Sequence, residues 1–214
     1  MVKKKKERNL IAGKEDKQLM WMLIIAGAIF ALFLGGYFYA QSLNHFDYAG
    51  VRWDKTKEGQ MNFFYSKFRL ADNPPAYNAY LRNDPRKNNV TVNATFKFAN
   101  KIFVSFEDYN PECQGKDAYL AAVISPFISA MGLNATGTIT NKTRAKEQNR
   151  TFADCNNATI AHSVIVIQSS DTPSIVQSAE NANCYYFNVG KCQQIETVER
   201  FIVAVLGQTS GEKI

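Results

Sequence analysis

The longest apolar stretch of the chain lies near its N-terminus, at residues 19–40, and contains no charged side chain. As an α-helix these residues would be about 33 Å long, enough to cross the hydrocarbon core of a bilayer. Aromatic residues stand near both ends, where their rings favour the membrane interface. The pattern predicts a transmembrane helix, because a buried core helix would have a shorter apolar stretch and usually a polar stripe.

The chain that follows alternates aromatic and β-branched residues with turn residues, as strands and hairpins do. A turn at residues 57–59 joins the first two predicted strands. Asp84 begins another turn, with Pro85 at its second position. The predicted strands of this part cover residues 48–55, 60–70, 77–82, 90–95 and 101–107.

Helical spacing appears at residues 117–131, where apolar residues recur every three or four positions up to Gly132. Pro126 should bend or shorten this helix. Short apolar runs at 163–168 and 184–189 predict central strands, and a last helix should end at Gly207. The fold class is therefore α+β: one N-terminal transmembrane helix, then a single disulfide-containing mixed β-sheet domain with two main helices.

Charge orients the predicted helix. The chain has a formal net charge of +6, yet seven of its 25 basic residues lie within the first 17 positions, beside only three acidic ones. We therefore expect a cytoplasmic basic tail (1–18), a signal-anchor helix (19–40), a short stem (41–47) and an extracytoplasmic domain (48–214) on the plasma membrane. With the excess charge confined to the tail, a nucleic-acid-binding surface has no support.

Two alternatives to the signal-anchor share its basic start. A cleaved signal peptide would have a shorter apolar region, and the best cleavage motif, at residues 40–42, is poor. A pilin-like leader cut after Gly13 would leave four charged residues before the apolar stretch, so a filament subunit is the less favoured alternative.

Two features past the apolar stretch fit an exported domain. One is a set of six N-x-T glycosylation motifs, about threefold more than the Asn and Thr content predicts by chance. Four of the six fall within one 24-residue stretch, which predicts an exposed, glycan-covered surface. The acceptors are Asn89, Asn93, Asn134, Asn141, Asn149 and Asn157.

The other feature is an even number of cysteines, which in an oxidising compartment indicates two disulfides. They are Cys113, Cys155, Cys184 and Cys192. We favour pairing Cys184 with Cys192 and Cys113 with Cys155, although the sequence permits all three pairings. Zinc binding is the alternative, but no C-x-x-C spacing is present.

Several motifs together resemble uncharacterised single-pass membrane-anchored proteins of small-genome archaea. The resemblance rests on YLRNDPR at residues 80–86, the isolated cysteines, Cys184-Tyr185, and Glu199-Arg200-Phe201 in the final helix. It implies an archaeal surface location and no known activity, and it assigns no catalytic residue.

Candidate chemistry is sparse. His162 is the plausible general base of the domain, but we favour a structural role for it at the end of a strand. His45 is interpreted as a residue of the membrane interface. The acidic loop of Glu107, Asp108 and Glu112 has oxygen ligands for a hard cation, although such loops are more often solvated surface. No phosphate-binding loop or nucleophile motif is present.

A basic cluster flanks the Asp84 turn and has the chemistry to contact an acidic partner: Arg82, Arg86 and Lys87. Taken together, the sequence predicts a membrane-anchored, N-glycosylated cell-surface protein without a cofactor. Its role would be non-catalytic binding or assembly with another membrane or envelope protein. The alternative is an anchored ligand-binding domain or enzyme that uses His162 or the acidic loop.

Overall fold

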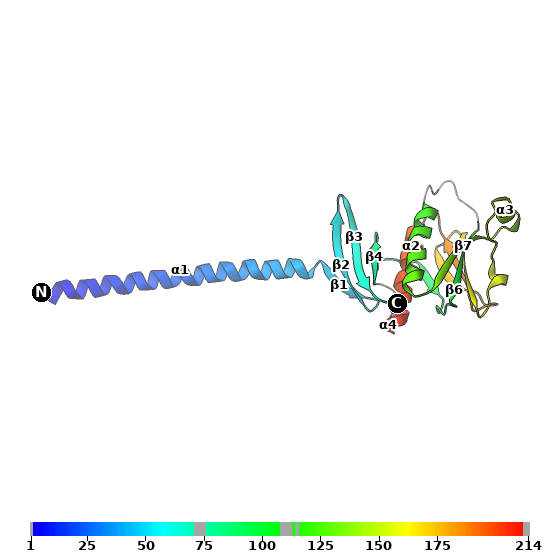
Figure 1. Cartoon of the computed structure of the whole chain (residues 1–214). Coiled ribbons are helices and arrows are strands. Elements are labelled where there is room, and N and C mark those ends of the chain that lie inside the picture. The colour runs from blue at the N-terminus through cyan, green and yellow to red at the C-terminus, as the bar shows by residue number, and fades with distance from the viewer. Residues whose placement is uncertain (1, 71–75, 108–112, 114–115, 212–214) are drawn as a thin grey trace. The chain divides into compact units, whose positions relative to one another are not determined.

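The computed structural model describes residues 2–70, 76–107, 113 and 116–211, with side chains from residue 18 onward except that of Asp117 (Figure 1). Asp108 and Glu112 of the predicted acidic loop lie outside the described residues. The chain divides into two compact units, Met1–His45 and Phe46–Ile214.

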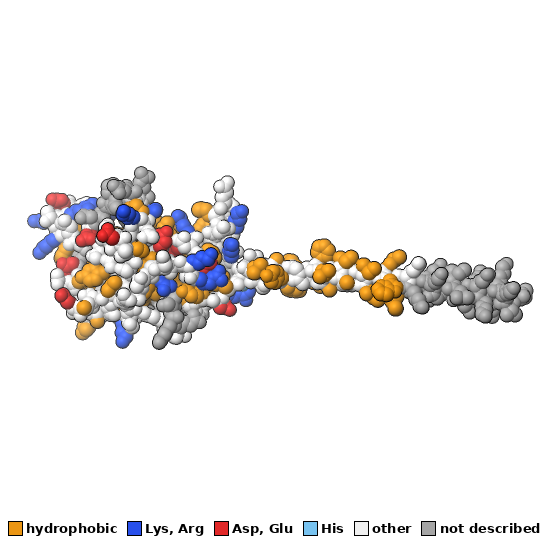
Figure 2. Space-filling view, turned by 180° about the vertical axis from the view of Figure 1, so that it is seen from behind, with side chains coloured by type: hydrophobic (Ala, Val, Ile, Leu, Met, Phe, Trp, Pro, Cys, Tyr) orange, Lys and Arg blue, Asp and Glu red, His pale blue; other side chains and the backbone are white. Residues whose placement is uncertain are grey.

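The first unit is the helix α1 (Val2–Ser42). Its Gln18–Ser42 part is long and apolar enough to cross a membrane, and every side chain of that part is exposed (Figure 2). A helix whose apolar side chains face outward all round requires an apolar surrounding. The predicted apolar helix is thus confirmed, and its length and composition suit a membrane anchor or a signal sequence. The last turn of α1 and the strand β1 (His45–Tyr48) occupy the predicted stem.

The second unit begins with a four-stranded sheet in the order β1-β2-β3-β4. Its other strands are β2 (Val51–Glu58), β3 (Met61–Phe68) and β4 (Tyr77–Leu81), which pair antiparallel. The predicted hairpin is confirmed, with Gly59 at φ +62° in the turn between β2 and β3. The predicted Asp84 turn is also present, since the N–H of Lys87 donates to the carbonyl of Asp84 at 2.9 Å.

A six-stranded sheet in the order β5-β9-β10-β8-β6-β7 forms the second layer. Its strands β7, β6, β8 and β10 run parallel, and β9 runs antiparallel to β10. Their bounds are β5 (Thr91–Asn93), β6 (Lys101–Phe106), β7 (Asn134–Ile139), β8 (His162–Ser169), β9 (Ser174–Gln177) and β10 (Cys184–Val189). Neither β7 nor β9 was predicted, because β7 is an edge strand with few apolar residues and β9 has only four residues.

The helices α2 (Lys116–Ala130) and α4 (Gln194–Ser210) pack between the two sheets (Figure 1). Phe127 of α2 has its ring centroid 5.4 Å from that of Tyr77 in β4 and 5.5 Å from that of Phe201 in α4. Phe201 in turn lies 5.0 Å from Phe187 of β10. The core therefore runs from one sheet through both helices to the other, and the α+β prediction is confirmed.

Pro126 and Gly207 were expected to limit the two helices of the domain. Pro126 lies inside α2 without ending it. The predicted stop of α4 at Gly207 is wrong, since the helix continues to Ser210 and ends at Gly211, whose φ of +77° is the left-handed conformation that glycine adopts at little cost. The buried part of α4 ends at Gly207, which is where the apolar pattern ends. The helix itself continues to Ser210 through residues that are exposed.

Shorter elements lie on the face of the six-stranded sheet opposite the helices, which we call the outer face. They are α3 (Lys142–Glu147) and the single turn η2 (Cys155–Asn157). Ala158 and Cys155 pack there against Val164 and Val166 of β8 in a second, small apolar cluster. The half of the outer face near the start of β8 is thus covered.

Both disulfides are present, but the pairing favoured from sequence is wrong. The structure joins Cys113 to Cys192 and Cys155 to Cys184, with Cα–Cα distances of 5.1 and 5.4 Å. Cys184 begins the six-residue strand β10 and Cys192 lies in the turn beyond its end, so the length of the strand, roughly 17 Å, separates them. A disulfide needs Cα atoms within about 7 Å.

We expect a non-reducing proteolytic digest of the native chain to yield two cross-linked peptide pairs, one holding Cys113 with Cys192 and the other Cys155 with Cys184. Mass spectrometry before and after reduction identifies the pairs. A peptide linking Cys184 to Cys192 would contradict the strand assignment of β10, since these cysteines meet only if that strand is not extended.

Candidate functional site

Polar side chains form a row across the outer face, near the ends of the parallel strands. Gln168 of β8, Asn188 of β10 and Ser174 of β9 are register partners and point to the same face. Glu107 extends the row beside Gln168, because its N–H donates to the carbonyl of Ile167 at 3.0 Å and so continues the pairing of β6 with β8. We call these four residues the polar row.

Hydrogen bonds join three members of the polar row. Gln168 Nε2 donates to Asn188 Oδ1 at 2.8 Å, and Asn188 Nδ2 donates to Ser174 Oγ at 2.9 Å. These bonds fix both amides in one orientation, yet each amide has a second N–H and further lone pairs. Since the three side chains are only half-buried and Glu107 is exposed, the row presents ordered donors and acceptors to solvent.

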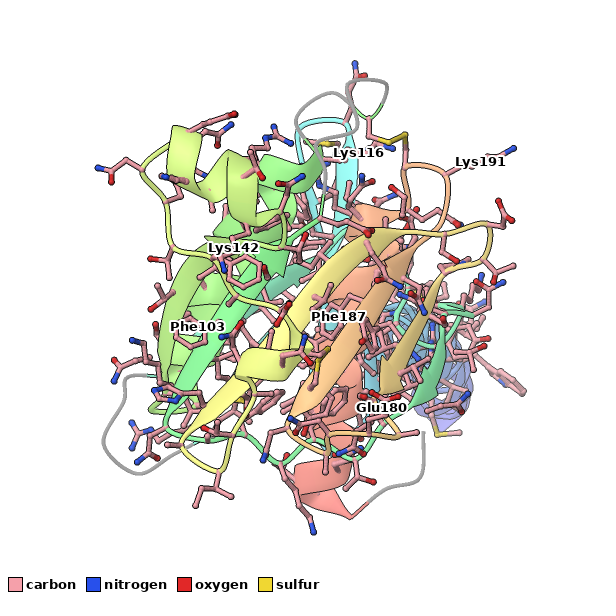
Figure 3. The ribbon with its side chains drawn as sticks, turned by 90° about the vertical axis from the view of Figure 1, so that its right-hand side faces the viewer. Phe103, Lys116, Lys142, Glu180, Phe187 and Lys191 are labelled. Atoms are coloured by element: carbon pink, nitrogen blue, oxygen red, sulfur yellow. A yellow bond between two sulfur atoms is a disulfide. The ribbon has the colours of Figure 1, made fainter. Side chains whose placement is uncertain are left out.

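The polar row lies where parallel sheets commonly bind ligands, outside the carboxyl ends of the strands. After β6 the chain passes through α2 to β7, which is the neighbour of β6 on one side. The next strand, β8, is the neighbour of β6 on the other side, so the order of the strands reverses at β6. Figure 3 looks onto the outer face, with Lys191 marking this edge and Glu180 the opposite one. The Cys113–Cys192 disulfide ties the loop after β6 to the loop after β10 at this edge.

His162 lies at the opposite end of the outer face. Its ring stacks on that of Phe103 with centroids 5.5 Å apart, and its Nδ1 lies 3.3 Å from Thr159 Oγ1. The neighbouring Ser163 hydroxyl points away and accepts the N–H of Ala99 at 2.9 Å. His162 pairs with Lys101, so about 20 Å of strand separates it from Glu107. The two groups cannot act on one substrate, and no Ser–His pair forms here.

The basic cluster is largely used within the domain. Arg86 binds Asp84 through two hydrogen bonds of 3.0 and 2.7 Å, and its guanidinium lies 3.8 Å from the ring centroid of Phe46. The Arg86 guanidinium lowers the pKa of the Asp84 carboxyl below its ordinary value. Arg82 stacks on the ring of Tyr119 at 4.6 Å, and Lys87 is exposed. Contact of this cluster with an acidic partner stays a prediction.

Glu199 is a buried carboxyl group that was not among the predicted site residues. It is 1% exposed on α4 and accepts the backbone N–H of Arg82, the N–H of Asn83 at 3.2 Å and Asn83 Nδ2 at 2.8 Å. Burial raises the pKa of the Glu199 carboxyl to about 7, although these donors act to lower it. The sequence did contain a signal, because Glu199 falls on the apolar face between Ile195 and Ile202.

Through Glu199, two motifs that are over a hundred residues apart come together. The turn that follows β4 is bound to the middle of α4, and Arg200 adds a hydrogen bond of 3.1 Å from its Nε to the carbonyl of Val90. Being enclosed, Glu199 joins the four-stranded sheet to α4 and offers no surface to a ligand.

All six acceptor asparagines are exposed, including the four of the 134–157 stretch for which exposure was predicted. Asn93 lies on β5 and Asn134 on β7, the two edge strands of the six-stranded sheet. Asn141 caps α3 through its Oδ1, which accepts the N–H of Arg144 at 3.1 Å, and Asn157 Oδ1 accepts the N–H of Asp154 at 2.9 Å. In both asparagines these hydrogen bonds use Oδ1, whereas a glycan is attached to Nδ2.

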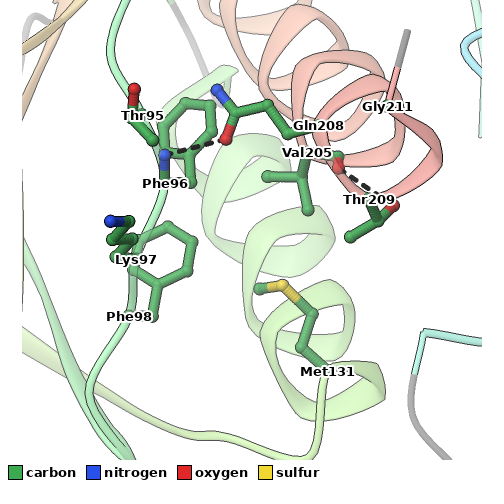
Figure 4. A pocket seen from close by; sticks show the side chains of 9 residues that line it. All are labelled: Thr95, Phe96, Lys97, Phe98, Met131, Val205, Gln208, Thr209 and Gly211. Carbon is green, nitrogen blue, oxygen red and sulfur yellow. Dashed lines mark hydrogen bonds between the residues drawn. The ribbon is translucent and has the colours of Figure 1, made fainter.

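The domain surface has three recesses of note. A largely apolar one of about 500 Å³ lies between residues 95–98 and the end of α4, where Gln208 accepts the N–H of Phe96 at 2.8 Å and donates to the carbonyl of Ala94 (Figure 4). A small recess of about 120 Å³ adjoins Cys113 and Gly190. The third, of about 470 Å³, has Asn149 in its wall.

Within the described part of the chain, no group of three His, Cys, Asp or Glu side chains is placed to hold a metal ion. All four cysteines are in disulfides. On the face shown in Figure 2, basic and acidic side chains are interspersed over the domain.

The chain matches no protein-family model, and comparison with curated proteins and with solved structures finds no match. The fold and the site geometry therefore carry the functional argument.

We expect the domain to lose stability as the pH rises from 5 to 8. With a folded-state pKa of about 7, above the ordinary 4.5, the folded protein holds the Glu199 proton more tightly than the unfolded chain does. Its contribution is fully present below pH 4.5 and is lost as the pH rises through 7, by about 3 kcal/mol. Denaturant unfolding across this pH range measures the loss.

Glu199→Gln should abolish most of this pH dependence, since glutamine does not titrate. Glu180→Gln, at an exposed position between β9 and β10, is the matched control and should keep the wild-type slope. A Glu199→Gln protein with an unchanged slope would assign the pH dependence to other groups.

Proposed function

We propose that this chain is a membrane-anchored, N-glycosylated surface protein whose extracytoplasmic domain binds a neighbouring envelope or membrane protein without catalysis. The observation that carries the proposal is the combination, in one chain, of an apolar helix exposed on all sides with a disulfide-linked domain whose six acceptor asparagines are all exposed. Disulfides form and persist in oxidising compartments, which supports an extracytoplasmic location.

The polar row is the proposed binding surface. Its amide and hydroxyl groups both donate and accept hydrogen bonds, and Glu107 is its one charged member, so it suits a neutral polar segment of a protein partner. The row is preorganised by its own hydrogen bonds, which reduces the entropy lost on binding. A binding role is favoured over a catalytic one because the Ser163 hydroxyl beside His162 is bonded to the N–H of Ala99, and Glu107 lies at the opposite end of the sheet from His162.

The predicted topology is tested by protease treatment of intact cells. We expect residues 48–214 to be degraded while the basic tail is protected, since seven basic residues lie in the 17 positions before the helix, whereas the first basic residue after it is Arg52. Intact-mass analysis should find residues 1–13 still attached. Protection of the domain in intact cells would overturn the proposal, and loss of the tail would favour the pilin-like alternative.

The binding surface is tested by a photo-crosslinking residue placed at Gln168 in the full chain, in native membranes. We expect a protein adduct of one defined mass, and a matched crosslinker at the exposed Lys57 of β2 should not give it. Asn188→Ala should lower the yield several-fold, because it removes the central amide of the row, whereas Lys57→Ala should not. An adduct from Lys57 but none from Gln168 would assign the binding to another surface.

A further inference from the structure

Asn149 differs from a simple surface acceptor because it lies in the wall of a recess. The recess is about 470 Å³ in volume and lies beside β7, the open edge of the six-stranded sheet. Of the three recesses described above, this is the one with an acceptor asparagine in its wall. Its lining residues are Phe106, Ala121, Gly137, Thr138, Asn149, Arg150 and Thr151.

The backbone holds the Asn149 acceptor motif in place. Asn149 follows the end of α3 with φ +51°, a left-handed conformation that asparagine tolerates better than most residues. The N–H of Arg150 donates to the carbonyl of Ala145 at 2.8 Å, and the carbonyl of Thr151 accepts the N–H of Ile139 at 3.0 Å. A group attached to Asn149 therefore starts from a fixed position next to β7.

The walls of the recess combine apolar and polar groups. Phe106 and Ala121 give apolar surface, and Arg150 and Thr151 give hydrogen-bonding groups. A sugar ring has an apolar face and a rim of hydroxyls, so it matches this mixture of surfaces.

The position of β7 at an edge of the sheet gives a reason for a sugar to occupy this recess. The open N–H and C=O groups of an edge strand can pair with another chain, and proteins commonly cover them. The 151–153 segment pairs with β7 at Ile139, where Phe152 is the bridge partner. The recess borders β7 next to this point, at Gly137 and Thr138.

We propose that the first sugars of the glycan at Asn149 pack into this recess, cover the edge of β7 and stabilise the domain. This inference rests on the proposed N-glycosylation. It separates Asn149 from Asn141, which is at the other end of α3 and lines none of the three recesses.

The test compares substitutions of the acceptor threonines in the full chain, produced in a glycosylating host. Thr151→Ala removes the Asn149 glycan without changing Asn149, and Thr151→Ser keeps the motif. The same pair at Thr143 addresses Asn141. We expect Thr151→Ala to lower the Tm by roughly 3 °C relative to Thr151→Ser, and Thr143→Ala to match Thr143→Ser within about 1 °C.

Two controls make the result decisive. In protein made without glycosylation, Thr151→Ala and Thr151→Ser should have the same Tm; an equal fall there would assign the effect to the threonine and overturn the inference. Glycopeptide mass spectrometry gives the occupancy. An unoccupied Asn149 beside other occupied sites, or equal Tm values for the glycosylated pair, overturns this inference alone, whereas six unoccupied sites overturn the proposed glycosylation as well.

Discussion

The domain depends on the burial of one helix, α4, between two sheets. Phe201 contacts Phe127 on one side and Phe187 on the other, and burying such a side chain contributes roughly 1.5–3 kcal/mol. Because Glu199 on this enclosed helix has no access to water, its carboxyl group must form its hydrogen bonds with other groups of the protein. The turn after β4 supplies its donors, and this polar contact fixes how the four-stranded sheet meets the helix layer.

The two faces of the six-stranded sheet have different roles as a result. The inner face, with Ile165, Ile167 and Phe187, packs on the helices. The outer face is covered near the start of β8 by the η2 segment, which the Cys155–Cys184 disulfide holds there, and it is polar near the strand ends. This difference leaves the polar row as the ordered, half-buried surface on which the proposed binding rests, with acceptor asparagines on both edge strands.

Sequence patterns predicted the elements that bury apolar residues at a regular period. The apolar helix, the β2–β3 hairpin, β6, β8, β10, α2 and α4 were all expected close to where they lie. Three strands were missed: β1 and β9 have only four residues each, and β7 is an edge strand with few apolar residues, so their hydrophobic patterns are too weak to read. The candidate site was predicted only in part: Glu107 was named, but Gln168, Asn188 and Ser174 look like ordinary polar residues until strand register aligns them.

The sequence by itself determined the apolar helix, the α+β class and the presence of two disulfides, because each depends on composition or on local periodicity. Only the tertiary structure decided which cysteines pair, that His162 and Glu107 are far apart, and that Glu199 meets Arg82 and Asn83. The physical reason is that these contacts join residues distant in sequence. Their distances follow from strand direction and sheet order, which no local pattern of residues specifies.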